Sequence, residues 1–378
     1  MRLLLPLLLA TTIAAAQKPR ARALGVPFDG TPGKNNAITD VPGVEVGYKT
    51  LISGKGGKGD PAVRTGVTVI LPRGKSIEPW TGGWFCLNGD GEMTGTTVID
   101  EYGLGYGPIG LTNTNSVGTV RDAIGQWSVR RFSKGGIVDF SFGLPVVAET
   151  FDGILNDING FHVKTEHVWS ALDSARGGAV AEGNVGGGTG MSLFGFKGGN
   201  GTSSRVVRID SARYTIGVFV QANFGGRDDL LIAGIPVGRE ITDLKPVYNT
   251  KPKDGSIIVV VATDAPLLPS YVKLLAKRAA LGVARTGGMA YNSSGDIFLA
   301  FSTQAPAENE KEALTSWSSL PKERLDGLYR AVVTATEEAI INALVGAETM
   351  EGVNGNKNYA LPHDRLREIL KKYNRIKM

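Results

Sequence analysis

The chain has 378 residues, of which 42% are hydrophobic and 20% charged, and its formal net charge is +5 at pH 7. This hydrophobic content excludes a disordered chain, and the length suits one large domain or two ordinary ones. The basic residues form no aromatic-and-basic patch, so nucleic acid is not an expected partner, and the single cysteine excludes an intramolecular disulfide or a multi-cysteine zinc site.

The first 16 residues have the composition of a secretory signal peptide. Arg2 precedes a short leucine-rich run, and small residues follow up to Ala16, which is the order of charged, apolar and cleavage regions in such signals. The run is too short to span a bilayer comfortably. We therefore expect residues 1–16 to be removed, leaving residues 17–378 in the periplasm or outside the cell, without membrane association. The alternative is that these residues stay on the chain as an uncleaved anchor.

The first half of the mature chain mixes short strands and helices. The patterns predict a strand over residues 65–71, helices over 92–102, 117–132 and 167–175, and a hairpin of strands over 204–210 and 214–223. Residues 111–118 are predicted to form a polar loop leading into the helix over 117–132, and one interpretation of its polar residues is that Asn115 or Ser116 caps this helix. The hairpin ends on Asn223, so an amide side chain lies at the end of a strand.

A turn followed by a buried strand occupies residues 253–264. Residues 257–261 are an unbroken β-branched run, typical of a strand covered on both faces, and Asp254-Gly255 is a turn signal. Ser256 is then the first residue of a central strand. It is either a serine in a turn, or the N-terminal nucleophile of a chain that cuts itself before Ser256 and uses the new amine as base.

The remaining elements complete a mixed pattern without βαβ regularity. The sequence predicts a helix over residues 269–284, a strand over 297–301, a long helical pattern within 323–350 and a basic helix over 363–378. Such a mixture favours an α+β domain with layered sheets. The sequence contains no internal repeat and no clear domain boundary.

Histidine is scarce, which narrows the possible chemistry. The chain has three histidines, and His162 and His167 are five residues apart, the wrong spacing for one helical face. This argues against a histidine-based metal site and against a Ser-His-Asp triad, and we expect no metal or other cofactor. An α-amine, with a pKa of about 7.7 to 8.0, can serve as the base instead.

Three further residues, Gly255, Asn223 and Glu149, have side chains or positions that suit acyl transfer. Gly255 has no Cβ to obstruct attack on its carbonyl group, and Asn223 or backbone N–H groups could bind an oxyanion. Glu149 ends an apolar segment and lies at the edge of a core, where a carboxylate either pairs with a neighbour or faces a cleft.

Many segments, in order along nearly the whole mature chain, resemble one peptidase family. They include residues 37–47, Asn-Gly-Asp-Gly-Glu-Met-Thr-Gly at 88–95, Thr-Asn-Thr-Asn-Ser-Val-Gly at 112–118, and residues 144–153, 183–191, 220–223, 255–266 and 293–303. The chain is similar to the DmpA/BapA-type enzymes, the L-aminopeptidase/D-esterases and β-peptidyl aminopeptidases. This resemblance implies an α+β fold, a four-layer αββα sandwich like that of N-terminal-nucleophile hydrolases but with different connectivity.

The resemblance also implies a self-cleaved enzyme. A single peptidase domain, residues 17–378, would cut itself between Gly255 and Ser256 into an α chain, 17–255, and a β chain, 256–378. The expected partners are short peptide, amino-acid amide or ester substrates, with no nucleic acid. The active form would be a homo-oligomer of αβ units.

By position, the resemblance assigns a role to each candidate residue. Ser256 is the expected nucleophile and Asn223 the side chain that helps hold the oxyanion. Ser294 and Asp296 are expected to support the nucleophile and its amine, and Glu149 to hold the free amino group of the substrate.

Two positions depart from the family pattern. Asp296 replaces the glutamate of the best-described β-peptidases and is one methylene shorter, which changes its reach to Ser256. Phe151 is the nearest match to a tyrosine that DmpA-like enzymes place near Glu149, and it lacks the hydroxyl. One oxyanion donor is then missing, which favours a β-peptidase-type preference or lower activity.

Alternatives remain open for both the residues and the function. Ser294 and Asp296 could form a loop-to-strand turn, and Glu149 could be a buried carboxylate paired with an arginine. The leading function is an aminopeptidase that releases α- or β-amino acids. The others are an acyltransferase of related fold and a catalytically silent secreted peptide-binding protein.

Overall fold

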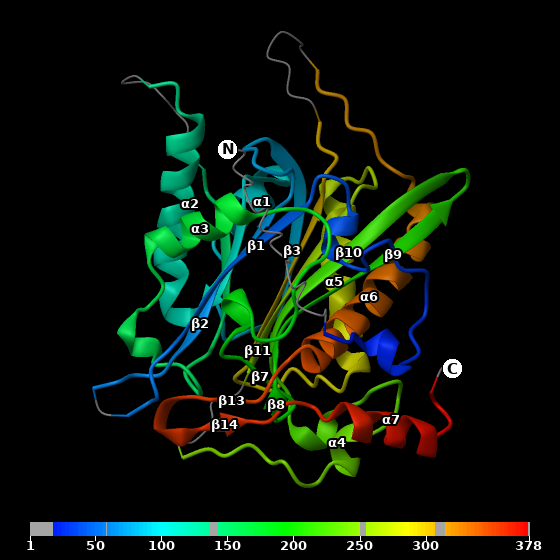
Figure 1. The fold of residues 1–378 in the computed structure, drawn as a ribbon. Coiled ribbons are helices and arrows are strands. Elements are labelled where there is room, and N and C mark those ends of the chain that lie inside the picture. The colour runs from blue at the N-terminus through cyan, green and yellow to red at the C-terminus, as the bar shows by residue number, and fades with distance from the viewer. Residues whose placement is uncertain (1–17, 58, 136–142, 250–254, 307–313, 377–378) are drawn as a thin grey trace, which may run out of the picture.

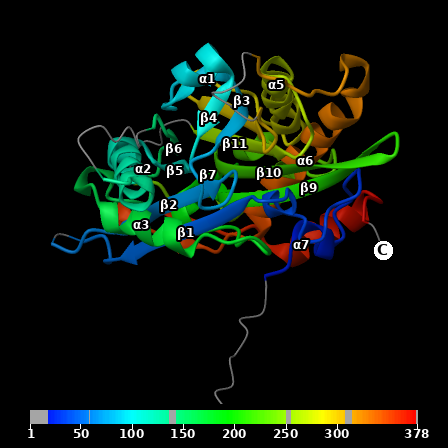
Figure 2. The ribbon, with the colours of Figure 1, turned by 90° about the horizontal axis from the view of Figure 1, so that it is seen from above.

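The computed structural model describes residues 18–57, 59–135, 143–249, 255–306 and 314–376. The predicted signal peptide, residues 1–16, lies outside the described residues. Two stacked β-sheets form the middle of the molecule, with helices on both outer faces (Figures 1 and 2). The predicted four-layer αββα sandwich is confirmed.

The strand order of each sheet mixes distant parts of the chain. The four-stranded sheet has the order β1 (Glu45–Ser53), β2 (Val63–Leu71), β5 (Ile109–Asn113), β6 (Val146–Thr150). The six-stranded sheet has the order β4 (Leu104–Tyr106), β3 (Pro79–Gly89), β12 (Gly295–Ser302), β11 (Ser256–Thr263), β10 (Ala212–Asn223), β9 (Gly199–Ile209). β11 pairs with β10 antiparallel and with β12 parallel, so it lies in the interior of its sheet.

Helices cover the outer face of each sheet. α2 (Val117–Phe132) and α3 (Thr165–Ser174) pack on the four-stranded sheet, whereas α5 (Pro269–Arg285) and α6 (Asp326–Val345) pack on the six-stranded sheet. Smaller elements lie around these layers: α1 (Thr96–Tyr102), α4 (Val237–Glu240), α7 (His363–Lys372), and the strand pairs β7 (Ser192–Leu193) with β8 (Phe196–Lys197) and β13 (Met350–Glu351) with β14 (Lys357–Asn358). In the described part of the chain, no helix is long and apolar enough to cross a membrane.

β11 explains why a run of β-branched residues specifies the centre of this fold. Ile257 and Val259 belong to the core under α5 and α6, and Ile258 and Val260 belong to the core between the two sheets. All eight residues of the strand are buried. Successive side chains of a strand point to opposite faces, so a strand covered on both sides is apolar along its middle, from Ile257 to Ala262.

Most predicted elements occur, but two predictions in the first half are wrong. The helix expected over residues 92–102 begins only at Thr96, because the Thr94 N–H donates to the carbonyl of Val147 in β6. The loop expected over residues 111–118 is strand β5 up to Asn113. Ser116 precedes α2 without a side-chain capping hydrogen bond, and the Asn115 amide donates instead to the carbonyl of Ile158, so neither side chain caps the helix.

Candidate active site

Three strand ends meet around Ser256. In the antiparallel pair, Ser256 at the start of β11 lies opposite Asn223 at the end of β10. In the parallel pair, Ser256 lies opposite Gly295 at the start of β12. The strand register therefore brings the predicted nucleophile beside the predicted oxyanion donor, although they are 33 residues apart in the sequence.

The Gly255 carbonyl group is held in place by its neighbours. The Gly295 N–H donates to the Gly255 carbonyl oxygen over 3.3 Å. A Cβ added at Gly255 would lie 1.9 Å from the carbonyl oxygen of Asn223, far inside van der Waals contact. Only glycine fits at this position with the backbone in its present place, next to a Ser256 side chain that is itself buried.

Ser294 and Asp296 lie at the start of the neighbouring strand. The Ser294 hydroxyl donates to Asp296 Oδ1 over 2.7 Å. Burial raises the pKa of the Asp296 carboxyl, and hydrogen bonds from Ser294 and from the Ile257 N–H act in the opposite direction. Asp296 is a residue of β12 and reaches the backbone directly after Ser256. The alternative that these two residues form a loop-to-strand turn applies only to the backbone of Ser294. Its N–H donates to the Tyr291 carbonyl oxygen and so forms a turn.

Glu149 lies near the end of β6 and is 2% exposed. Its Oε2 accepts a short hydrogen bond from the Thr114 hydroxyl, and its Oε1 accepts from the Glu92 N–H over 3.1 Å. Gly91 keeps the Glu92 loop close, because a Cβ there would lie 3.2 Å from Glu149 Oε1. The carboxylate is thus fixed by a hydroxyl and a backbone amide.

Thr114 and the Glu92 amide were not predicted as parts of the site. Thr114 follows β5, and β5 pairs in parallel with β6, so its side chain comes beside Glu149. The polar run Thr-Asn-Thr-Asn-Ser at residues 112–116, directly after apolar residues 109–111, was the available signal. Polar residues at the end of a buried strand often line a site.

Two cavities flank the Gly255–Ser256 peptide bond. The smaller, of about 300 Å³, is lined by Gly89, Asp90, Gly91, Glu92, Thr114, Glu149, Phe151, Ser256 and Ser293. The larger, of about 730 Å³, includes Asn223, Gly255, Ser294 and Asp296 in its lining. Each of the seven predicted site residues therefore lines one of these two cavities. Gly255 lines the larger cavity and Ser256, the next residue, lines the smaller one.

Phe151 contributes both a ring and a carbonyl group to this region. Its carbonyl oxygen accepts a 2.9 Å hydrogen bond from Asn223 Nδ2. Its ring lies over Gly153, since a Cβ at Gly153 would come within 2.5 Å of Phe151 Cζ. The structure thus connects Phe151 to Asn223 through the backbone, a contact that the sequence did not predict.

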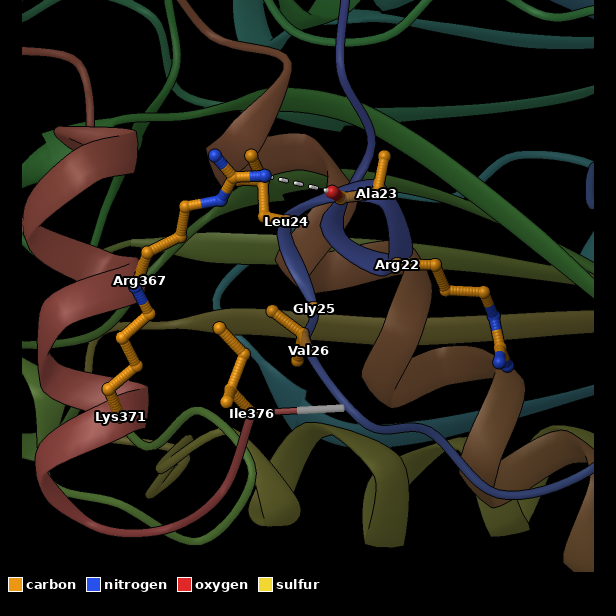
Figure 3. Close-up of a pocket in the computed structure, with 8 residues that line it drawn as sticks. All are labelled: Arg22, Ala23, Leu24, Gly25, Val26, Arg367, Lys371 and Ile376. Atoms are coloured by element: carbon orange, nitrogen blue, oxygen red, sulfur yellow. Dashed lines mark hydrogen bonds between the residues drawn. The ribbon is translucent and has the colours of Figure 1, made fainter. Parts of the chain in front are cut away.

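Another pocket lies apart from these strand ends, between residues 22–26 and α7 (Figure 3). Arg22, Arg367 and Lys371 line it together with apolar and main-chain groups. Its lining contains no carboxylate, hydroxyl or amide side chain, so it lacks the groups for acyl transfer. Within the described ranges, no cluster of three histidine, cysteine or acidic side chains could hold a metal ion.

Residues 36–358 match the model of peptidase family S58. The chain belongs to this family. The resemblance to DmpA/BapA-type enzymes, and the aminopeptidase activity predicted from it, are confirmed.

Among the relatives of this S58 peptidase is the β-peptidyl aminopeptidase BapA of Sphingosinicella microcystinivorans. It is 54% identical over 96% of this chain and 94% of its own length. The homologous BapA of Sphingosinicella xenopeptidilytica is 49% identical over 97% of this chain and 96% of its own length.

Solved structures agree with the four-layer fold. The L-aminopeptidase D-Ala-esterase/amidase of Ochrobactrum anthropi, described as a variant of the Ntn hydrolase fold, superposes with a TM-score of 0.88 at 45% identity. The match covers 95% of this chain and all of that one. A Burkholderia β-aminopeptidase superposes with a TM-score of 0.85 at 45% identity, over 94% of this chain and 99% of its own.

Proposed function

We propose that this peptidase is a self-processing serine aminopeptidase that releases N-terminal amino acids, α or β, from short peptides, amides or esters. The observation that carries the proposal is the strand register that sets Ser256 between Asn223 and Gly295. The names of the relatives, β-peptidyl aminopeptidase and L-aminopeptidase D-Ala-esterase/amidase, support the substrate class. The proposed steps use side-chain and backbone groups of the chain together with water.

Maturation is the first step of the proposed mechanism. Ser256 Oγ attacks the Gly255 carbonyl carbon, the hydroxyl proton passes to the Ser256 nitrogen as the C–N bond breaks, and an ester links Gly255 to the serine. Water then hydrolyses the ester, which leaves a carboxylate on Gly255 and a free amine on Ser256. The Gly295 N–H, already bonded to the Gly255 oxygen, lowers the energy of the oxyanion that forms there.

Turnover repeats the same chemistry on a substrate. The Glu149 carboxylate, held by Thr114 and the Glu92 amide, binds the substrate ammonium group. Ser256 Oγ attacks the substrate carbonyl while the Ser256 amine takes the hydroxyl proton and passes it to the leaving group. Asn223 Nδ2 donates to the oxyanion, and water releases the amino acid from the acyl-enzyme.

Ser294 and Asp296 orient the nucleophilic residue. The Asp296 carboxylate holds both the Ser294 hydroxyl and the Ile257 N–H, so it fixes the backbone next to the new N-terminus. An amine must lie close to its own hydroxyl and in the correct rotamer to act as base. The aspartate reaches this backbone position despite its shorter side chain.

Substitution of Ser256 tests the proposal directly. Ser256→Ala should give folded, uncut protein that releases no amino acid from β- or α-aminoacyl amides, measured by chromatography of the products. Ser270→Ala, on the exposed start of α5, is the matched control and should behave as wild type. Persistent hydrolysis by Ser256→Ala would refute the proposed nucleophile.

Two further assays separate the alternative functions. Added amine acceptors should not divert most of the acyl group from water, whereas an acyltransferase would form mainly the transfer product. A silent binding protein would bind short peptides without cleaving them, and its chain would remain in one piece.

We also propose export of the chain and assembly of processed αβ units into a homo-oligomer. The composition of residues 1–16 supports the first and the family resemblance supports the second. Cell fractionation with N-terminal sequencing tests export to the periplasm or the medium. Light scattering after size-exclusion chromatography gives the number of αβ units.

A further inference from the structure

A lysine lies fully buried beside the candidate active site. Lys197, at the end of β8, is 0% exposed. Its Nζ donates to the carbonyl oxygen of Met191 over 2.6 Å and to that of Gly198 over 2.9 Å. Burial lowers the pKa of this ammonium group to about 7, and the fully buried Asp152 opposes that shift. A buried charge is costly unless it is well paired, so its retention calls for an explanation.

The β7–β8 hairpin fixes where Lys197 acts. Phe194 and Gly195 both have positive φ, at 50° and 65°, as a two-residue hairpin turn of the I′ type requires. Ser192 and Lys197 are therefore direct partners across the hairpin. The Met191 carbonyl oxygen accepts from Lys197 Nζ and also from the Gly198 N–H over 2.9 Å, so the Met191–Ser192 peptide is held firmly on its carbonyl side.

The other side of the same peptide contacts Asn223. The Ser192 N–H donates to Asn223 Oδ1 over 2.7 Å. A backbone N–H can only donate, so it requires the oxygen of the Asn223 amide to face Ser192. The nitrogen must then face the other way, where one of its hydrogens is donated to the Phe151 carbonyl over 2.9 Å. The second hydrogen of Nδ2 is the one available to an oxyanion.

We propose that Lys197 is a positioning residue for this oxyanion donor. Its ammonium group fixes and polarises the Met191–Ser192 peptide, which in turn orients and polarises the Asn223 side-chain amide. Successive hydrogen bonds strengthen one another in a low-dielectric interior, and the positive charge at the far end of this chain favours negative charge at the near end. The inference rests on the role of Asn223 in the proposed function.

Lys197→Met tests this role, because methionine keeps most of the aliphatic stem and removes the charge and the donors. We expect kcat per cleaved molecule to fall about tenfold, while KM for an aminoacyl amide changes less than about twofold. A peptide boronate, whose adduct with Ser256 carries an oxyanion, should bind about tenfold more weakly. Lys75→Met is the matched control, because Lys75 also donates to a main-chain carbonyl, that of Asp173, in the outer helical layer, and it should leave kcat unchanged.

A double-mutant cycle with Asn223→Ala distinguishes positioning from a general structural role. If Lys197 acts through Asn223, Lys197→Met should have less than about a twofold effect on kcat in the Asn223→Ala background. An undiminished tenfold effect there would overturn the inference, as would a wild-type kcat for Lys197→Met alone. If Asn223→Ala itself keeps wild-type kcat, the oxyanion role in the proposed function fails instead.

A second variant covers the case in which Lys197→Met does not fold. Lys197→Gln offers a shorter neutral donor in place of the charge and should lose less kcat than Lys197→Met. Equal kcat for wild type and Lys197→Gln, with weaker thermal stability alone, would assign Lys197 a purely structural role. Boronate affinity serves as the readout wherever residual activity is too low to measure.

Discussion

The Gly255–Ser256 peptide bond lies in a place where the backbone leaves no room for a side chain. Gly255→Ala should slow self-cleavage more than tenfold, because its Cβ would lie 1.9 Å from the Asn223 carbonyl oxygen and would push the scissile carbonyl away from Ser256 Oγ. The fraction of cut chain over time, measured on denaturing gels, reports the effect.

Gly125→Ala is a suitable control for this substitution. Gly125 lies within α2, and a Cβ there would meet no atom within 4 Å. Alanine is the better helix former by about 1 kcal/mol, so this variant should be cut at the normal rate and be slightly more stable. Equal cutting of both variants would contradict the account of Gly255.

In the proposed function Glu149 binds the substrate ammonium group through its charge, and the Thr114 hydroxyl holds the carboxylate in place. Glu149→Gln should raise KM for substrates with a free amino group about 10- to 100-fold, since a hydrogen bond to a charged group contributes about 1.5–3 kcal/mol. Thr114→Val keeps the shape and removes the hydroxyl donor, so KM should rise about fivefold. Steady-state kinetics on one amide substrate gives both values. Unchanged KM in Glu149→Gln would exclude Glu149 as the amine-binding group.

Ionisation of Asp296 is expected to make both the folding stability and the activity depend on pH, in opposite directions. Burial raises its pKa in the folded chain above the ordinary value of 3.8, so the folded state binds this proton more tightly than the unfolded state. The stability contributed by the protonated carboxyl is therefore full below about pH 4 and is lost as pH rises through the raised pKa. Activity has the opposite trend, because only the carboxylate accepts from both Ser294 and Ile257.

Comparison with Asp296→Asn measures this effect. From pH 4 towards neutrality, the wild type should lose stability relative to the variant in thermal unfolding, while the acid limb of its rate profile rises. Parallel stability curves for the two proteins would show that Asp296 ionises as in the unfolded chain.

The sequence and the family resemblance identified the candidate site residues, whereas the residues that hold them in place could not be predicted. Ser256, Asn223 and Asp296 stand at strand ends that the sequence pattern or the family resemblance identified. Thr114 and Lys197 act through contacts set by the β5–β6 pairing and by a two-residue hairpin. Such contacts depend on register between distant segments, which a single sequence does not contain.

β11 carries the packing of two cores, so both of its faces should be equally sensitive. Val259→Ala, facing α5 and α6, and Val260→Ala, facing the other sheet, should each lower the free energy of unfolding by about 2–3 kcal/mol. Ile52→Ala in β1, where the side chain is 56% exposed, should change it by less than about 0.5 kcal/mol. Denaturant unfolding measures the free energy of unfolding of all three variants. An unchanged value for Val259→Ala or Val260→Ala would contradict the burial of both faces of the strand.

Periodicity predicted some elements well and missed others for identifiable reasons. The β-branched run at residues 257–261 indicated β11, because a strand that is buried on both faces requires apolar residues at successive positions. β3 was not predicted, because its glycines obscure the strand pattern. The structure explains one of them, Gly83, since a Cβ there would lie 2.4 Å from the Lys273 N atom of α5. Close approach of a helix to a strand selects glycine and weakens the sequence signal.

The whole molecule should remain in one piece after cleavage. In the six-stranded sheet, β11 and β12 of the expected β chain lie between β3 and β10 of the expected α chain. Separation would break two strand ladders and expose the cores on both faces of the sheet. The two fragments should therefore co-elute in size-exclusion chromatography and part only in denaturant. Fragments that separate under native conditions would contradict this.

The element pattern predicted an α+β domain with layered sheets, whereas the four-layer αββα arrangement was predicted through the family resemblance. Local patterns could not give the number of layers or the strand order, because the order of strands in the two sheets depends on contacts between residues far apart. β12, for example, pairs with β3, which lies more than 200 residues earlier. One helical pattern also extended past the true end of α6 at Val345.

The measurement that tests the central claim most directly is the intact mass of the purified protein under denaturing conditions, with N-terminal sequencing of the smaller fragment. The account predicts two chains, of which the smaller begins Ser-Ile-Ile-Val at Ser256. A single uncut chain that hydrolyses aminoacyl amides would contradict it, because the nucleophile would then have no free amine to act as its base.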